Sequence, residues 1–154
     1  MSNGMIKTTL FVVTAGVVVA GLGYIRLAPM EAEAWHLDPT TATRTGKPND
    51  YLVADGGDRP AIVLPGTPEA VLNRLDAVAM AEAGVTRLAG SPAEGLVTYV
   101  QRTRLMGYPD AISVSAVPDD GGARLSIYSR SRYGQADLGV NKARVERWLA
   151  ALDL

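Results

Sequence analysis

The arginines are the side chains whose type and spacing point most directly to chemistry. The chain has twelve arginines against three lysines, and four of the arginines alternate along two predicted strands. A guanidinium is planar and can donate two parallel hydrogen bonds to a carboxylate or a phosphate. These four arginines and the polar or aromatic residues near the same strand ends are the candidate binding residues: Arg102, Arg104, Tyr108, Asp110, Tyr128, Arg130, Arg132, Asp137 and Asn141.

Two interpretations of the four strand arginines stay open. In the functional one they form a patch on one side of the sheet that binds an anion or docks a partner. In the structural one they pair across the strands with Asp110, Asp137 and Glu94, which gives exposed ion pairs of small energetic value. Exposed ion pairs are common on protein surfaces, so the pattern favours the structural interpretation.

Most catalytic and metal-binding patterns lack the residues that they require. The sequence has no cysteine and a single histidine, His36, so thiol nucleophiles and cysteine-ligated metals are excluded and no histidine cluster exists. It has no phosphate-binding glycine loop. Asp110 and Asp137 remain as candidates for acid–base work, but a tight turn and a helix cap are their simplest roles. We therefore expect no metal site and no cofactor.

The elements that would position these residues follow from the hydrophobic periodicity. Thr67 is a predicted helix N-cap with Pro68 in the first turn, and Gly84 ends that helix. Asp137 is expected to cap a second helix with one apolar stripe. Residues 119–122 (DDGG) predict a hairpin turn. The predicted strands span residues 61–64, 85–89, 96–105, 110–117 and 123–131.

This order of elements predicts an α+β fold. Consecutive strands joined by tight turns form an antiparallel β-meander, and two amphipathic helices must then cover one face of it. Alternation along the last strand directs Leu125 and Ile127 towards the helices and Tyr128 and Arg130 away from them. A helix-grip arrangement and a flatter α/β sandwich are both compatible with the pattern.

Three segments are expected along the chain. Residues 1–28 form a transmembrane anchor, residues 29–60 an extended linker or arm rich in turn residues, and residues 61–154 the α+β domain. Within the arm, Trp35 and His36 form a small apolar cluster that could dock on the domain or rest at the lipid surface.

The predicted anchor is the strongest signal in the sequence. The eighteen residues from Thr8 to Ile25 contain no charged side chain, and as a helix they span about 27 Å, close to the hydrocarbon thickness of a bilayer. A cleaved signal peptide is the alternative, because residues 32–34 (AEA) match a small-residue cleavage site. The length of the apolar run, and the position of Arg26 and Pro29 before that site, favour a retained anchor.

The flanking charges bear on the orientation of the anchor. Lys7 and the α-amine favour a cytoplasmic N-terminus, whereas Arg26, Arg44 and Lys47 lie on the other flank. A short N-terminal tail before a folded domain leads us to expect a single-pass protein of the bacterial inner membrane with a periplasmic domain. Gly16 and Ala20 are spaced for packing against another membrane helix.

The domain also resembles a known family. The resemblance rests on residues 97–104, 107–110, 128–141 and 144–149, covers roughly residues 35–152 and is most specific in the stretch SRSRYGQADLGVN. These residues resemble the DUF1499 family, and residues 26–29 followed by Trp35 and His36 resemble its proteobacterial members. The resemblance implies a bacterial envelope protein with a single anchor and implies no particular reaction. It also gives weight to residues 130–141, where Asp137 and Asn141 are expected to hold Arg130 or Arg132 across the junction between strand and helix.

Three functional hypotheses follow. The first is a non-enzymatic accessory or binding module that contacts an envelope protein or a small anionic or lipid-like ligand. The second is a hydrolase-like enzyme in which Asp110 or Asp137 is the base and Arg130 or Arg132 binds an oxyanion. The third is an accessory subunit of a respiratory or photosynthetic membrane complex. A net charge of −1 gives no basis for nucleic-acid binding.

Overall fold

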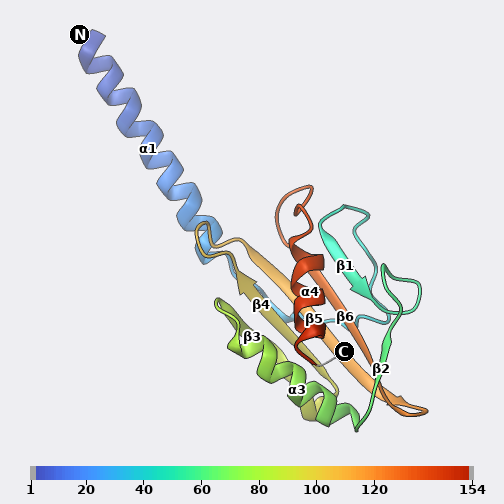
Figure 1. The fold of residues 1–154 in the computed structure, drawn as a ribbon. Helices are drawn as coiled ribbons and strands as arrows, with labels where there is room; N and C mark the ends of the chain where they lie inside the picture. Colours follow the sequence, from blue (N-terminus) through green and yellow to red (C-terminus); the bar gives the residue numbers. More distant parts are fainter. Residues whose placement is uncertain (1–2, 153–154) are drawn as a thin grey trace.

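A six-stranded antiparallel sheet organises the fold in the computed structural model, which describes residues 3–152 (Figure 1). Neighbouring strands run in the order β1-β6-β5-β4-β3, and β2 pairs with β6 as well. The strands are β1 (Asp50–Val53), β2 (Ile62–Leu64), β3 (Val85–Ser91), β4 (Leu96–Arg102), β5 (Pro109–Asp119) and β6 (Gly122–Ser131). The helices are α1 (Asn3–Leu27), α2 (Ala32–Trp35), α3 (Pro68–Ala81) and α4 (Val140–Ala150), with a short 3-10 turn, η1 (Pro92–Glu94).

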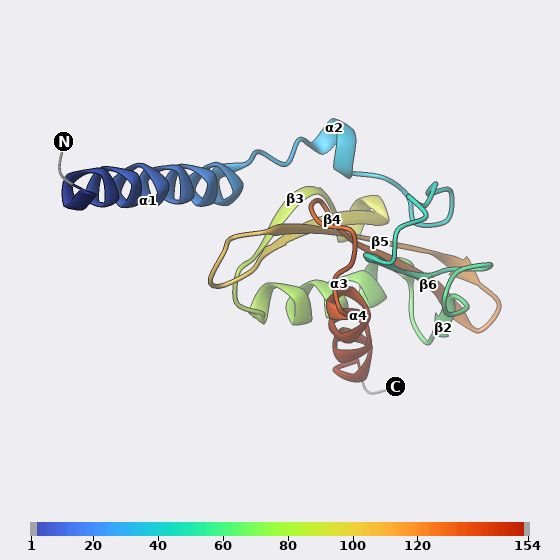
Figure 2. The same cartoon turned by 90° about the horizontal axis from the view of Figure 1, so that it is seen from above.

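Helices α3 and α4 cover one face of the sheet, and the hydrophobic core lies between the two layers (Figure 2). The Thr67 hydroxyl accepts a hydrogen bond from the Ala70 amide at 3.2 Å, so α3 begins at the predicted cap. Trp148 of α4 packs edge-on against Tyr99 of β4, with ring centroids 5.7 Å apart. The predicted α+β class, with an antiparallel sheet packed against two helices, is confirmed.

The arm contributes more to the domain than the sequence indicated. Residues 50–53, expected within an extended linker, form β1, which pairs with the edge of β6 through the register Leu52 to Tyr128. The strand forms because its residues bury apolar surface: Tyr51, Leu52 and Val53 are all buried. The preceding segment, from α2 onward, runs across the sheet face opposite α3 and α4 (Figure 2).

Strand β4 ends at Arg102 rather than at residue 105. Thr103 closes a turn: its backbone amide donates to the Tyr108 carbonyl, and its carbonyl accepts from the Gly107 amide. Its hydroxyl accepts from the Tyr108 amide at 2.9 Å. Leu105 therefore sits at the tip of the β4–β5 hairpin, and Arg104 does not share a strand face with Arg102 as predicted.

Helix α1 is a long apolar rod that extends away from the sheet (Figure 1). Its 24 residues from Gly4 to Leu27 are long and apolar enough for a single membrane span or a signal sequence, and its apolar side chains are not buried by the domain. Gly16 and Ala20 lie on its exposed surface, and a Cβ at Gly16 would meet nothing within 4 Å.

Candidate functional site

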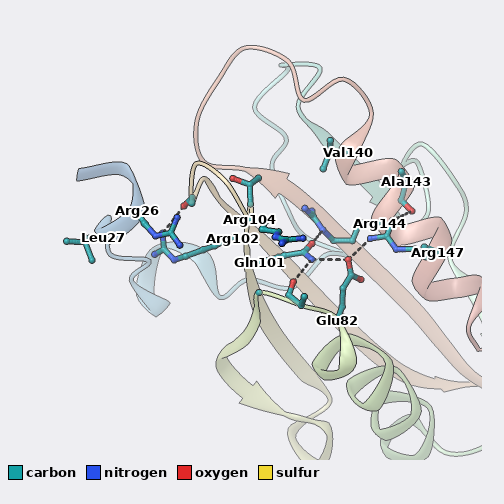
Figure 3. A pocket seen from close by; sticks show the side chains of 14 residues that line it. Arg26, Leu27, Glu82, Gln101, Arg102, Arg104, Val140, Ala143, Arg144 and Arg147 are labelled. Carbon is teal, nitrogen blue, oxygen red and sulfur yellow. Dashed lines mark hydrogen bonds and ion pairs between the residues drawn. The ribbon is translucent and has the colours of Figure 1, made fainter. Parts of the chain in front are cut away.

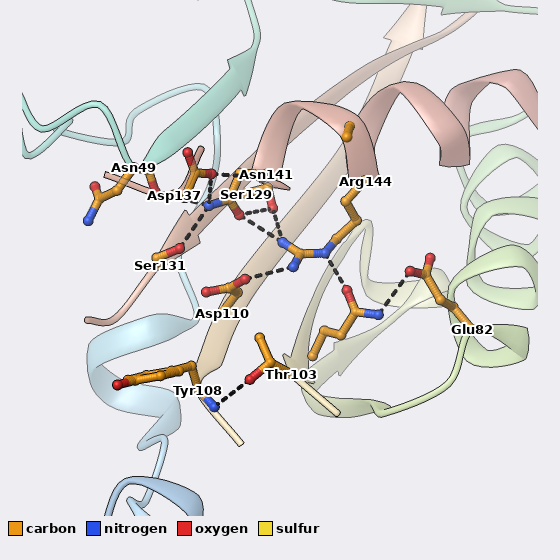
Figure 4. Close-up of polar contacts among 12 residues, drawn as sticks. Asn49, Glu82, Thr103, Tyr108, Asp110, Ser129, Ser131, Asp137, Asn141 and Arg144 are labelled. Atoms are coloured by element: carbon orange, nitrogen blue, oxygen red, sulfur yellow. Dashed lines mark hydrogen bonds and ion pairs between the residues drawn. The ribbon is translucent and has the colours of Figure 1, made fainter. Parts of the chain in front are cut away.

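A buried polar network joins the end of β6 to the start of α4 (Figure 4). Asn141 lies at its centre: its amide nitrogen donates to the Asn49 carbonyl at 3.0 Å, to Ser131 Oγ at 2.9 Å and to Asp137 Oδ2 at 2.7 Å. Its amide oxygen accepts from Ser129 Oγ at 2.6 Å. Both the nitrogen and the oxygen of this amide therefore have hydrogen-bond partners, as a buried polar side chain requires.

Asp137 lies two residues before Gly139, the N-cap residue of α4, so the predicted cap position is shifted, but the Asp137 carboxylate still binds amides at the start of the helix. Its carboxylate accepts from the backbone amide of Gly139 at 3.0 Å and from that of Asn141 at 2.8 Å, where α4 begins. A carboxylate at this position satisfies amides that have no partner within the helix and lies at the positive end of the helix dipole.

The arginine held at this junction is Arg144, not Arg130 or Arg132 as expected. Arg144 lies one turn after Asn141 on α4, and its Nη1 donates to Ser129 Oγ at 2.9 Å and to Asn141 Oδ1 at 2.8 Å. Its Nη2 forms an ion pair with Asp110 Oδ2 at 2.6 Å, with only 3% and 6% of the two side chains exposed.

Sequence reasoning missed Arg144, although a signal for it was present. Asn141, Arg144, Val145 and Trp148 follow each other at the spacing of one helix face, so a charged side chain on that face had to find a buried partner. The carboxylate that supplies this partner lies 34 residues earlier in the chain.

The ion pairs expected between the strand arginines and Asp110 or Asp137 do not form in the described part of the chain. The register of β4 and β5 places Gln101 opposite Asp110 and Arg102 opposite Pro109, so alternation turns Arg102 away from the carboxylate. Arg102 instead donates to the carbonyls of Ala28 at 2.6 Å and Ile25 at 3.4 Å, at the C-terminal end of α1.

The four strand arginines do not form one patch. Arg132 contacts the Pro29 carbonyl, next to the Ala28 carbonyl to which Arg102 donates, just after the end of α1. Arg130 lies under the arm, where its Nη2 donates to the Trp35 carbonyl at 2.5 Å and its guanidinium stacks 4.8 Å from the Tyr128 ring. Arg104 forms no hydrogen bond or ion pair with residues 3–152.

Arg130 and its neighbours fix the arm to the sheet. All hydrogen-bond acceptors of Arg130 are neutral, and burial lowers the pKa of its guanidinium to about 10. Burial, followed by the hydrogen bond to Asp50, raises the pKa of Tyr128 to about 12. His36 Nδ1 lies 2.9 Å from Thr98 Oγ1, which agrees with a structural role for the only histidine.

A cleft of about 830 Å³ opens between the end of α1, the β4–β5 hairpin and α4 (Figure 3). Gly107, at φ 73°, allows the hairpin to approach α1 closely, since a Cβ there would lie 2.7 Å from Cγ of Arg26. Five arginines and a single acid, Glu82, line the cleft. The arginines are Arg26, Arg102, Arg104, Arg144 and Arg147.

A second cavity, of about 450 Å³, lies beside this cleft. The rings of Tyr108 and Tyr133 meet edge-on in its lining, with centroids 6.1 Å apart. Thr103 and Val140 line both cavities. We call the first the arginine cleft and the second the tyrosine cavity.

Comparison with known proteins identifies the family of this domain. The family model described as "Protein of unknown function (DUF1499)" matches residues 38–152. The chain belongs to the DUF1499 family. The match begins in the arm and ends after α4, so the DUF1499 domain includes the sheet, the polar network and the lining of both cavities except the α1 residues. No curated protein and no solved structure matches the chain.

Among residues 3–152, the DUF1499 protein has no group of three or more His, Cys, Asp or Glu side chains placed to hold a metal ion. Asp110 and Asp137, the two candidates for acid–base work, are engaged by Arg144 and by the start of α4.

Glu82 is the acid of the arginine cleft, and it holds the end of α3 against α4. It accepts from Gln101 Nε2 at 2.9 Å, from Arg147 Nη2 at 2.5 Å and from the indole of Trp148. Burial opposes ionisation, but these three donors outweigh it and hold the pKa of Glu82 below its usual value of 4.5.

Glu82 should therefore make the stability of the DUF1499 domain depend on pH in the acidic range. Its contribution is fully present above the unfolded-state pKa and is lost as the pH falls through the lowered folded-state pKa. We expect the wild-type protein to lose stability below about pH 4.5 more steeply than Glu82→Gln, and Glu82→Gln to be the less stable protein at pH 7. Urea denaturation at a series of pH values tests this, and parallel pH profiles for the two proteins would refute it.

Proposed function

We propose that this DUF1499 protein is a membrane-anchored binding module whose arginine cleft takes a phosphate-bearing anion. The observation that supports the proposal is the excess of arginine over acid around one cavity: five guanidinium groups and one carboxylate. Guanidinium groups bind phosphate oxygens through paired, charge-assisted hydrogen bonds.

Not all five arginines are equally available to a ligand. Arg147 is paired with Glu82 and Arg144 with Asp110. Within residues 3–152, Arg26, Arg102 and Arg104 form no ion pair with a carboxylate, and Arg26 and Arg102 contact only backbone carbonyls. A phosphate in the cleft would be a negatively charged partner for these three guanidinium groups, which have no carboxylate partner within residues 3–152.

The position of the arginine cleft supports a role at the membrane. Arg26 and Leu27, the last residues of α1, line it, so a retained anchor would hold the cleft at the level of the lipid headgroups. We propose that the anchor is retained and that the domain lies on the periplasmic side of the inner membrane. Attachment there would raise the effective concentration of the domain near a membrane-bound ligand or an envelope protein partner.

The hydrolase hypothesis has less support. The proposed base, Asp110 or Asp137, would have to give up an ion pair or a helix cap, and Arg130 lies on the opposite sheet face from both. The binding-module hypothesis therefore requires fewer changes to the contacts in the structure than the hydrolase hypothesis does.

Thermal unfolding of the full-length protein in uncharged maltoside micelles tests the binding proposal. At pH 8 and constant ionic strength, replacing chloride by inorganic phosphate should raise the Tm, because a ligand that binds only the folded state stabilises it. Arg104 is exposed, so Arg104→Gln should fold normally and weaken phosphate binding about tenfold.

Arg74→Gln is the matched control for this experiment. Arg74 is an exposed arginine on α3 and does not line the arginine cleft, so its replacement should leave the phosphate-dependent increase in Tm unchanged. Equal Tm increases in the wild type, Arg104→Gln and Arg74→Gln would show that phosphate acts elsewhere and would overturn the proposal.

A further inference from the structure

The arginine cleft and the tyrosine cavity adjoin each other. They share Thr103 and Val140, and the buried ion pair stands between them: Arg144 lines the cleft and Asp110 lines the cavity. A ligand that extends from one cavity to the other past Thr103 and Val140 would have one end among guanidinium groups and the other against tyrosine rings.

The tyrosine cavity offers an apolar environment. Half of its lining residues are apolar or aromatic: Ile25, Tyr108, Tyr133, Ala136 and Val140. The polar residues around it are already engaged: Asp110 in the ion pair, and Ser131 and Asp137 with Asn141. The Tyr133 hydroxyl is buried and has no hydrogen-bond partner in the described part of the chain. A cavity of this size is sufficient for part of a small ligand.

The same side of the domain presents apolar side chains next to the end of α1. Leu105, at the tip of the β4–β5 hairpin, is 84% exposed, and Leu138, in the loop before α4, is 98% exposed. Both loops lie at the end of the domain from which α1 departs (Figure 1). Ile25 of α1 lines the tyrosine cavity itself, so this cavity borders the segment expected to enter the lipid.

We propose that the ligand is a phosphate-headed amphiphile, with its phosphate in the arginine cleft and its apolar chain in the tyrosine cavity beside Ile25. This inference rests on the proposed function and adds the chemical class of the ligand. A guanidinium-rich subsite next to an apolar one, at the membrane-proximal end of an anchored domain, matches the polarity of a phospholipid at the boundary between headgroup and chain.

A pair of probes that share one headgroup tests the inference. Methyl phosphate and dodecyl phosphate are both phosphate monoesters and differ only in the alkyl chain. Each is titrated calorimetrically into the full-length protein in a non-ionic amphipol, which removes competing detergent micelles. Because each buried methylene contributes favourably, dodecyl phosphate should bind at least about a hundredfold more tightly than methyl phosphate.

Two variants separate the two halves of the site. Ala136→Phe places a ring in the tyrosine cavity from an exposed position, and it should weaken dodecyl phosphate binding about tenfold or more while leaving methyl phosphate binding unchanged. Arg104→Gln should weaken the binding of both probes. Ala77→Phe, at an exposed position on α3 outside both cavities, is the matched control and should change neither.

The outcomes distinguish this inference from the proposed function. If the two probes bind with equal affinity, and both depend on Arg104, the ligand is a free phosphate and the amphiphile inference fails. If Ala136→Phe and Ala77→Phe have equal effects on the affinity for dodecyl phosphate, the alkyl chain does not occupy the tyrosine cavity, and the amphiphile inference fails. If neither probe depends on Arg104, the proposed function itself fails. Unchanged methyl phosphate binding in Ala136→Phe shows that this variant is folded.

Discussion

Replacing Asp110 by alanine should lower the free energy of unfolding by about 3–5 kcal/mol, because it leaves the buried guanidinium of Arg144 without its counter-charge. The carboxylate and the guanidinium are 2.6 Å apart, and both are almost fully inaccessible to water. Removing one partner of such a pair costs far more than the pair contributes, since the remaining charge is neither hydrated nor neutralised.

Chemical denaturation of the full-length protein in maltoside micelles measures this effect. The chain has two tryptophans, Trp35 and Trp148, and neither lies in α1, so tryptophan fluorescence follows the domain and not α1. Arg59→Ala is the control, because the pair between Arg59 and Glu146 is half-exposed and should contribute only about 0–1 kcal/mol.

A second substitution at the partner tests whether the charge is responsible. Arg144→Met should also be strongly destabilising, whereas the double variant Asp110→Ala with Arg144→Met should be more stable than the sum of the two single effects implies, because it buries no unpaired charge. A loss below 1 kcal/mol in Asp110→Ala, similar to that of Arg59→Ala, would mean that the pair is not buried as described.

The sequence was sufficient to predict the elements whose signals are local. The cap at Thr67, the turn at residues 119–122 and the alternation in β6 depend on neighbouring residues, and each lies where it was expected. Strand β1 has four residues in a turn-rich segment and has no period of its own. It forms because its residues are buried when it pairs with the free edge of β6, and that edge is about 75 residues later in the chain.

The candidate site was less predictable because its residues, too, are brought together by contacts between distant parts of the chain. The arginine cleft brings together Arg26, Glu82, Arg104 and Arg147, which lie on four separate elements or turns. Spacing along one strand predicted a shared face for Arg102 and Arg104, but β4 ends at Arg102 and the turn at Thr103 separates them. Both line the cleft, but Arg102 donates to backbone carbonyls, whereas Arg104 has no partner within residues 3–152.

The arm also covers one face of the sheet. The polar face that was expected to be open for binding is covered by α2 and the segment that follows it, which place Trp35 against Arg130 and His36 against Thr98. The available arginines are therefore those next to α1, and the candidate site lies at the end of the domain that meets α1.

Native mass spectrometry of the full-length protein, released from membranes in mild detergent, tests the central claim most directly. The claim is that a retained α1 holds the arginine cleft at the lipid surface, where it binds a phosphate-headed amphiphile. We expect the mass of a chain that still contains α1, with one bound molecule of phospholipid mass, and we expect Arg104→Gln to lose most of that bound species. A mature chain that begins near Trp35, or an intact chain whose bound lipid is unaffected by Arg104→Gln, would contradict the claim.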